Sequence, residues 1–487
     1  MSIFKRVSNL SSGVKSSIAF FIANAFSLGM SYLVTPIYTR LLSVEEYGQT
    51  AIFLTWFQIF AIVATFCLER GVFNNGMMDF DQDRDRYSFS LLLMSNIITV
   101  VVACIVFLFY PLIHDFIKLD FPFLILMFVV FLFQPAYLFW TARQRYEYKY
   151  KEMLIWSIII GILSPLVAII LIAINKEGER LYPRIFGAEL TLLAFYIFFY
   201  FRVAKNSKFK ISLKYWKYAF LFNLPLIIHY LSIYLLGSID KLMISFLVSD
   251  SATAYYSVAH AVASIALLFW TAINGSLIPY TYKKCEQKKY DDINRVTLPL
   301  IALFSLGCVM VILMAPEIVG IMAPNEYREA IYVIPPIVGG VFFQVQYFVY
   351  ANILYYYKKP AYVMIGSFVA VVLNVVLNYF CIIQWGYIAA GYTTILCYLV
   401  QALLDYLFMR IVSKAKIFNG KLILILSIVV IVISLLTNLI YDYIVPRYAI
   451  LGIIIVLIIV FRKRLLRVVN YKNPGRLSES KGDAKDE

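Results

Sequence analysis

Charge is scarce in this sequence. Only 15% of the 487 residues are charged, while 62% are hydrophobic. A soluble domain carries roughly 25% charged and about 45–50% apolar residues. No soluble core of this size buries so large an apolar share, so a soluble enzyme and a soluble nucleic-acid-binding protein are both excluded. We expect no nucleic-acid partner.

Histidine and cysteine are also sparse. The chain has three His residues, which argues against a His-based metal centre. Its six Cys residues are scattered in or beside apolar runs and include no CxxC pair, a pattern that fits neither a metal site nor a disulfide framework. We therefore expect no metal and no organic cofactor.

Long apolar runs dominate the chain and predict about fourteen transmembrane helices, since one span needs about 20 mostly apolar residues. The expected spans lie at 16–38, 48–68, 88–110, 121–141, 153–174, 184–202, 216–239, 252–276, 296–315, 330–356, 361–383, 386–409, 421–441 and 447–461. With a cytoplasmic N-terminus, roughly four fifths of the 43 Lys and Arg residues fall on the cytoplasmic side, as the positive-inside rule requires. Both termini are then cytoplasmic. The loops leave no room for a soluble catalytic domain, so we expect a transporter and not an enzyme.

Sequence landmarks recur at a nearly constant offset. Pro111 and Pro316 lie at the outer ends of the third and ninth expected spans, 205 residues apart, and Tyr47 and Tyr256 are 209 residues apart. This offset equals six spans, so two halves would insert with the same orientation, as in some secondary transporters. Coincidence among Tyr and Pro residues at helix ends is the alternative.

The repeat predicts an all-α integral membrane protein. Two six-helix lobes related by a parallel pseudo-twofold axis would enclose a central cavity. The expected parts are an N-terminal lobe at 1–205, a C-terminal lobe at 206–412, additional helices 13 and 14 at 413–469, and a disordered cytoplasmic tail at 470–487.

Polar side chains follow one face of several expected spans. Because a polar group facing lipid is costly, such faces turn toward protein or water. We interpret them as walls of the central cavity and as substrate-binding candidates; hydrogen bonding between helices is the alternative. The candidates are Asn24 and Ser31 in the first span, Asn223, Tyr230 and Tyr234 in the seventh, and His260 in the eighth.

Charged residues also interrupt apolar stretches. Asp240 and Lys241 interrupt an apolar run from about 218 to 248. A charge near the bilayer centre would cost roughly 2.5–3.5 kcal/mol, but the span count places both residues near the outer end of the seventh span, where the cost is less. Lys241, on the polar face, and Arg40, at the matching end of the first span, are predicted to bind an anion; snorkelling into the headgroups is the alternative. Asp240, His229 and Asp405 are candidates for ion coupling.

The cytoplasmic side is predicted to be basic. Arg143 and Arg145 lie in one of the basic segments there, which would draw anionic headgroups toward the inner mouth. Glu69 and Arg70, at the inner end of the second span, are expected to pair with each other.

Two groups of segments resemble the bacterial polysaccharide flippases, the translocases of O-antigen and capsule repeat units. Residues 35–42 (TPIYTRLL) and 46–48 (EYG) are similar to the junction of their first two spans. Residues 224–225 (LP), 240–244 (DKLMI) and 254–259 (AYYSVA) are similar to their seventh and eighth spans. These flippases share a multidrug/oligosaccharidyl-lipid/polysaccharide exporter superfamily with the drug extruders and the peptidoglycan-precursor flippase.

The resemblance implies alternating-access transfer of an undecaprenyl-diphosphate-linked oligosaccharide across a bacterial inner membrane, for O-antigen or other surface polysaccharide. Coupling of this transfer to a proton or sodium gradient is a further hypothesis. Membrane lipids and the polymerase and chain-length machinery of the pathway would be partners. One departure matters: peptidoglycan-precursor flippases carry several arginines in the first span, which here has none before Arg40. A drug exporter of the same fold, or a membrane glycan polymerase or glycosyltransferase, is the alternative.

Overall fold

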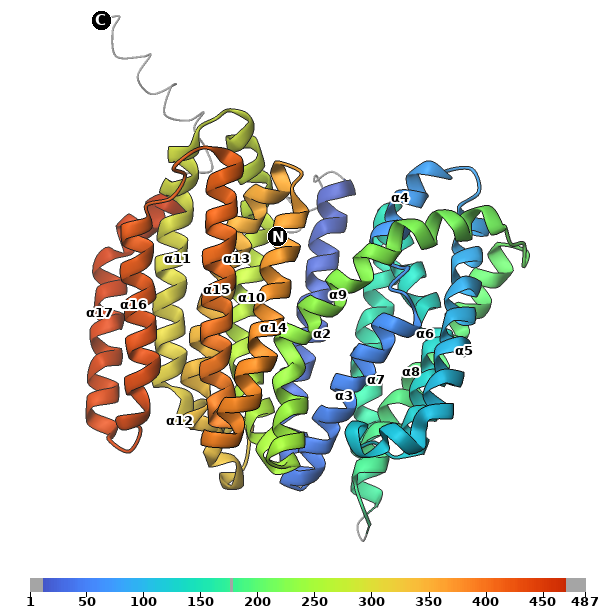
Figure 1. The fold of residues 1–487 in the computed structure, drawn as a ribbon, viewed down its shortest axis with the longest axis horizontal. Helices are drawn as coiled ribbons and strands as arrows, with labels where there is room; N and C mark the ends of the chain where they lie inside the picture. Colours follow the sequence, from blue (N-terminus) through green and yellow to red (C-terminus); the bar gives the residue numbers. More distant parts are fainter. Residues whose placement is uncertain (1–11, 176–177, 470–487) are drawn as a thin grey trace, which may run out of the picture. The chain divides into compact units, whose positions relative to one another are not determined.

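The structure is a computed structural model and describes residues 12–175 and 178–469 (Figure 1). This part of the chain is helical throughout and contains no strand. Its elements are α2 (Ser12–Leu41), α3 (Val44–Ala64), α4 (Gly71–Asp79), α5 (Arg84–Ile117), α6 (Phe121–Tyr146), α7 (Tyr150–Ile174), α8 (Leu181–Asn206), α9 (Leu213–Leu247), α10 (Asp250–Glu286), α11 (Tyr290–Leu313), α12 (Ala315–Met322), η1 (Asn325–Tyr332), α13 (Ile334–Tyr356), α14 (Pro360–Trp385), α15 (Ile388–Ser413), α16 (Gly420–Leu436), η2 (Thr437–Leu439) and α17 (Ile444–Val469). The tail predicted at 470–487 lies outside the described residues.

The predicted all-α membrane fold is confirmed. Within the described ranges, 12 helices are long and apolar enough to cross a membrane, and α2 and α17 correspond to the first and last expected spans. The main difference is in the second span: 48–68 was expected as one helix, but α3 ends at Ala64 and α4 begins at Gly71.

The chain divides into two compact units, which we describe separately. The first runs to Val258 and includes Ile321–Tyr327 and Asn378–Tyr387. The second consists of Ala259–Gly320, Arg328–Leu377 and the chain from Ile388. The lobe boundary predicted near residue 205 stays a prediction.

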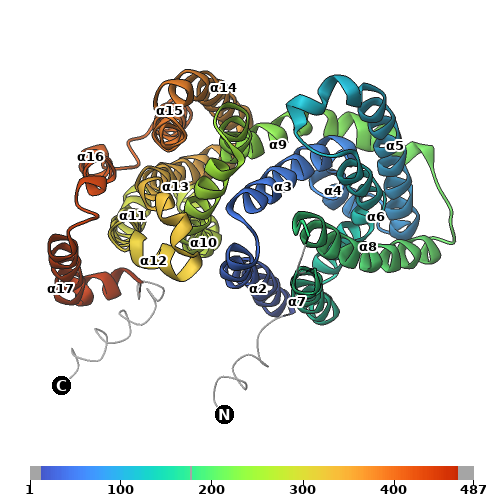
Figure 2. The same ribbon diagram turned by 90° about the horizontal axis from the view of Figure 1, so that it is seen from below.

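The first unit has a core rich in aromatic side chains. Helix α6 packs against α5 and α8 (Figure 2) and contributes the buried rings of Phe123, Phe131 and Phe139. Because lipid tails are as apolar as these side chains, close van der Waals packing is the main attraction between the helices. The core therefore fixes α6 as one wall of the recess described below.

Helix α3 has a well-defined start. Ser43 and Glu46 form a reciprocal capping box, with Ser43 Oγ accepting from the Glu46 backbone N–H at 3.1 Å. Gly48 then lets this end of α3 approach α10, since a Cβ at Gly48 would lie 1.9 Å from the carbonyl oxygen of Asp250. A side chain at position 48 would force the two helix ends apart.

The second unit is built around α13. Some 89% of its most apolar segment is buried, and it packs against α11, α15 and α16. Helix α17 packs on α11, where Leu451 meets Leu313. Arg447 of α17 is buried and donates to both carboxylate oxygens of Glu317, at 3.0 and 2.9 Å. The two additional helices expected after residue 412 therefore belong to this packed unit.

Candidate functional site

The break between α3 and α4 shapes the candidate site. Phe66 and Cys67 lie in the left-handed region of backbone space, with φ of 58° and 47°, which is unfavourable for residues other than glycine. Two backbone carbonyls at the break accept hydrogen bonds from α5: Ser95 Oγ donates to Thr65 at 3.2 Å and Thr99 Oγ1 to Ala64 at 3.0 Å. The break leaves these carbonyls without the hydrogen bonds of a continuous helix, and side chains of a neighbouring helix replace those bonds.

A recess with a volume of about 480 Å³ lies beside this break, within the size range of ligand-binding pockets. Residues of α3, the break, α4 and α6 line it. Its polar and charged lining residues are Gln58, Thr65, Glu69, Arg70, Asn74, Gln134, Thr141 and Arg145. Two guanidinium groups and several amides thus face one hollow in an otherwise apolar chain.

Arg70 makes the most distinctive contacts in this lining. Its Nε lies 3.5 Å from Glu69 Oε1, the local pairing that the sequence predicted. Its guanidinium also lies over the ring of Tyr230, 4.7 Å from the ring centre. Burial raises the pKa of the Glu69 carboxyl, and the adjacent Arg70 offsets this only in part. Protonation of Glu69 would leave the recess with the positive charges of Arg70 and Arg145, which favour an anion.

The predicted polar face of the seventh span lies against the broken helix. Asn223 is fully buried, and its Nδ2 donates to the carbonyl of Phe66. Tyr230 contacts Arg70, and the hydroxyl of Tyr234 donates to the Thr55 carbonyl at 3.5 Å. These side chains hold α9 to the wall of the recess. Their contact with substrate stays a prediction.

Asp240 is at the centre of a second polar cluster. It is buried, and its carboxylate accepts from the Tyr256 hydroxyl at 2.6 Å and from Asn378 Nδ2 at 2.5 Å. Within the part of the chain that is described, Lys241 forms no ion pair, and the buried Nδ1 of His229 has no hydrogen-bond partner. Hydrogen bonds therefore compensate the buried charge of Asp240, while its role in coupling stays a prediction.

Arg40 lies at the far end of α2 and bonds to backbone. Its Nη1 donates to the Pro36 carbonyl at 2.8 Å and its Nη2 to the Ile321 carbonyl at 3.2 Å. Thr39 Oγ1 likewise donates to the Met322 carbonyl at 2.8 Å. The structure thus gives Arg40 a partner in the segment Ile321–Tyr327, and its contact with an anion stays a prediction.

The remaining predicted residues are dispersed. Ser31 lies in α2, where its carbonyl accepts from Thr35 Oγ1 at 2.8 Å, and the side chain of Asn24 lies outside the described residues. In the second unit, His260 Nδ1 lies 3.3 Å from Ser264 Oγ, and Asp405 is fully buried. The recess therefore brings together residues that were not among the predicted binding residues. The local signals in the sequence were Glu69 and Arg70 at the end of an apolar run, and Arg145 in a basic segment.

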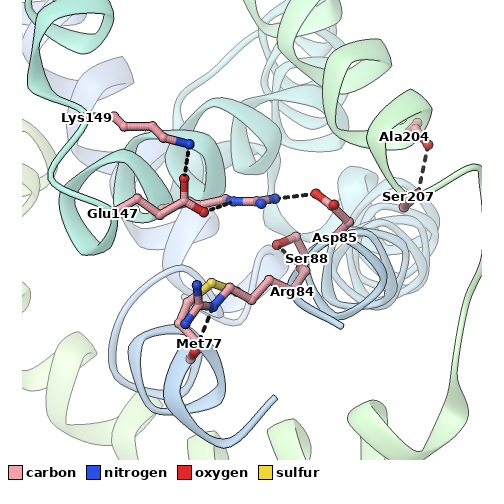
Figure 3. A network of polar contacts seen from close by, with 9 residues as sticks. Met77, Arg84, Asp85, Ser88, Glu147, Lys149, Ala204 and Ser207 are labelled. Atoms are coloured by element: carbon pink, nitrogen blue, oxygen red, sulfur yellow. Dashed lines mark hydrogen bonds and ion pairs between the residues drawn. The ribbon is translucent and has the colours of Figure 1, made fainter. Parts of the chain in front are cut away.

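The basic segment at the end of α6 is largely neutralised (Figure 3). Arg143 pairs with Asp85 and donates to Glu147 at 2.7 Å, while Lys149 donates to Glu147 at 2.6 Å. Burial works to raise the pKa of Glu147, but the hydrogen bonds from Lys149 and Arg143 outweigh it and hold that pKa below its usual range. Arg143 thus contacts acidic side chains, and Arg145 lines the recess.

Within residues 12–175 and 178–469, no group of three His, Cys, Asp or Glu side chains is arranged to hold a metal ion. An all-helical bundle with many spans and an arginine-lined recess is the architecture of a multi-pass membrane transporter. The chain belongs to the polysaccharide biosynthesis protein family, whose model matches residues 14–285. The MatE family model matches residues 225–380.

Two curated relatives cover most of the chain. One is the probable low-salt glycan biosynthesis flippase Agl15 of Haloferax volcanii, 24% identical over 80% of this chain and 82% of that protein. The other is Lsg locus putative protein 1 of Haemophilus influenzae, 22% identical over 71% of this chain and 85% of that protein.

Solved structures share the fold. The lipid II flippase MurJ, in an inward closed conformation, aligns with a TM-score of 0.62 at 16% identity, over 90% of this chain and 100% of MurJ. An inward-facing multidrug resistance MATE transporter of the MOP superfamily aligns with a TM-score of 0.62 at 12% identity, over 80% and 94% of the two chains. The family model confirms the predicted relationship to polysaccharide biosynthesis proteins, and the solved structures share the predicted fold.

Proposed function

We propose that this protein is a flippase that moves lipid-linked oligosaccharides across the membrane. The cargo would be an undecaprenyl-diphosphate-linked repeat unit for O-antigen or another surface polysaccharide. It would pass from the cytoplasmic to the periplasmic leaflet of a bacterial inner membrane by alternating access. The observation that carries the proposal is the recess at the α3–α4 break, with Arg70 and Arg145 in its lining. The family membership and the glycan flippase among the relatives support it.

The recess suits an anionic, sugar-bearing headgroup. Guanidinium groups recognise phosphate oxygens through paired, charge-assisted hydrogen bonds. The amides of Gln58, Asn74 and Gln134 offer both donors and acceptors, which sugar hydroxyls require. The polyprenyl tail would remain in lipid. Lys241 and Arg40 are proposed to meet the diphosphate at a later stage of transfer, with coupling to a proton or sodium gradient through Asp240 or His229.

A drug exporter is the second candidate, because the MatE family model matches residues 225–380. Such exporters of amphipathic cations would be favoured by a cavity rich in carboxylates. The recess instead carries two arginines and one carboxylate, so we favour the anionic cargo.

The test uses liposomes containing the purified protein and a polyprenyl-diphosphate oligosaccharide labelled on the sugar. A membrane-impermeant reductant bleaches only the outer leaflet, so flipping raises the bleached fraction above one half. Losing one guanidinium–phosphate hydrogen bond costs about 1.5–3 kcal/mol. Arg70→Gln and Arg145→Gln should therefore each raise the lipid concentration for half-maximal flipping by roughly 10- to 150-fold.

The matched control is Arg328→Gln, which removes the same charge from a side chain that is 71% exposed and outside the recess. It should flip like the wild type. Absence of flipping by the wild type would refute this cargo, and ethidium export would favour the drug exporter. Normal flipping by the Arg70→Gln/Arg145→Gln double variant would remove the recess from the mechanism, and normal flipping by Lys241→Ala would remove that residue.

A further inference from the structure

The second unit contains a buried carboxylate that no hydrogen bond satisfies. Asp405 of α15 is 0% exposed, and neither of its carboxylate oxygens has a hydrogen-bond partner. No Lys, Arg or His of the described ranges forms an ion pair with it. An ionised carboxylate in such surroundings is strongly unfavourable, and it normally neutralises or binds a cation.

Gln401, one helical turn before Asp405 on α15, also has a buried acceptor oxygen without a hydrogen-bond donor. Gln401 Nε2 donates to Ser367 Oγ at 2.9 Å, and Ser367 Oγ donates to the Val363 carbonyl at 3.0 Å. This chain of donors fixes the amide of Gln401 with its Oε1 buried and without a partner. Gln401 and Asp405 are four residues apart, so they share one face of α15. This face of α15 therefore carries three buried acceptor oxygens, one on Gln401 and two on Asp405, that have no donor.

The helices packed around Asp405 offer no compensating charge. From α13 the titratable groups that face it are Tyr347 and Tyr355. From α14 it meets Gly366, where a Cβ would lie 3.0 Å from Asp405 Oδ1, so the glycine leaves the space that the carboxyl fills. On α15 itself, Arg410 contacts the Tyr406 hydroxyl at 3.5 Å.

We propose that Asp405 is an intramembrane proton-binding site whose protonated carboxyl donates to Gln401 Oε1. One bound proton removes the charge and satisfies an orphan acceptor on each side chain. A hard metal cation usually takes about six or more oxygen ligands, and three unsatisfied oxygens fall short of that number. Uptake of the proton on one side of the membrane and its release on the other would couple the gradient to transport, and this coupling rests on the proposed flippase function.

Proton binding is tested without transport, by infrared spectroscopy of the whole protein in lipid nanodiscs. At neutral pH the wild type should show a C=O stretching band of a protonated carboxylic acid that disappears in Asp405→Asn. The control Asp442→Asn, at a side chain that is 70% exposed, should keep the band. Gln401→Leu should shift the band to higher frequency, because the carboxyl loses its hydrogen-bond acceptor.

Coupling is tested in liposomes with a proton or a sodium gradient. The amide of Asp405→Asn mimics the protonated carboxyl, so this variant should flip lipid but lose the stimulation by a proton gradient. A wild type that shows the band but flips no lipid would leave the proton site intact and refute the proposed function. A spectrum with no band from Asp405, or a band that disappears on addition of sodium, would overturn the proton site. Unchanged stimulation in Asp405→Asn would overturn the coupling.

Discussion

The hydrogen bond between α9 and the α3–α4 break makes a sharp prediction. Asn223 is fully buried and donates to the carbonyl of Phe66, where the backbone is left-handed. Replacing Asn223 by Leu would leave that carbonyl without a partner, which costs about 1–3 kcal/mol. The variant also removes Asn223 Oδ1, which has no partner itself. We therefore expect the closed form of the break to lose about 1–2 kcal/mol.

The labelling rate of the Cys67 thiol measures this loss of stability of the closed break. Cys67 is 2% exposed, and burial raises the pKa of its thiol to about 12, with a further upward effect from Glu69. Maleimides react with the thiolate, so labelling requires local opening of the break. A loss of about 1–2 kcal/mol multiplies the open population by roughly 5- to 30-fold. The labelling rate should rise by the same factor.

The assay uses a chain in which Cys67 is the only cysteine, labelled in nanodiscs and followed by mass spectrometry. Ser232→Ala is the control, because Ser232 Oγ donates to the Ile228 carbonyl within α9 itself. It should label at the parent rate. Equal rates for Asn223→Leu and Ser232→Ala would refute the view that α9 holds the break closed.

Other contacts give further predictions. Arg447→Met should lower the free energy of unfolding by about 1.5–3 kcal/mol, because it removes the charged hydrogen bonds to Glu317, which retains the bond from the Tyr448 hydroxyl, and the bond to the Leu313 carbonyl; SDS titration measures this, and Arg447→Met/Glu317→Leu should recover part of the loss. Burial works to raise the pKa of Glu317, but its bonds to Arg447 hold that pKa below its usual range. The stability from this pair should therefore be full above about pH 4.3, the pKa of an unfolded Glu, and fall as the pH drops below it; a flat profile over this range would contradict the pairing. Tyr256→Phe removes the donor that lies 2.6 Å from the Asp240 carboxylate and should cost about 1.5–3 kcal/mol by the same titration; an unchanged free energy of unfolding would contradict a stabilising role for this bond.

Much of the fold could be predicted from the sequence because each membrane span carries its own apolar signal. The same signal concealed the break. Residues 48–68 are apolar enough to pass as one helix, yet the chain turns after Ala64. The contacts at the turn come from Ser95 and Asn223, which lie about 30 and 160 residues away in sequence. No periodicity within one segment reveals partners of that kind.

The polar face of α9 shows why the candidate site was only partly predictable. A polar residue in a membrane helix indicates a polar partner. That partner is either a ligand or a backbone group that has lost its hydrogen bond within a helix. At Asn223 the described partner is the backbone of Phe66, and at Tyr234 it is the carbonyl of Thr55. A substitution at either position would thus deform the wall of the recess even if the side chain never touched cargo. Loss of flipping in such a variant is not proof of substrate contact. Unchanged Cys67 labelling together with impaired flipping would assign the residue to the substrate, whereas a parallel change in both would assign it to the wall.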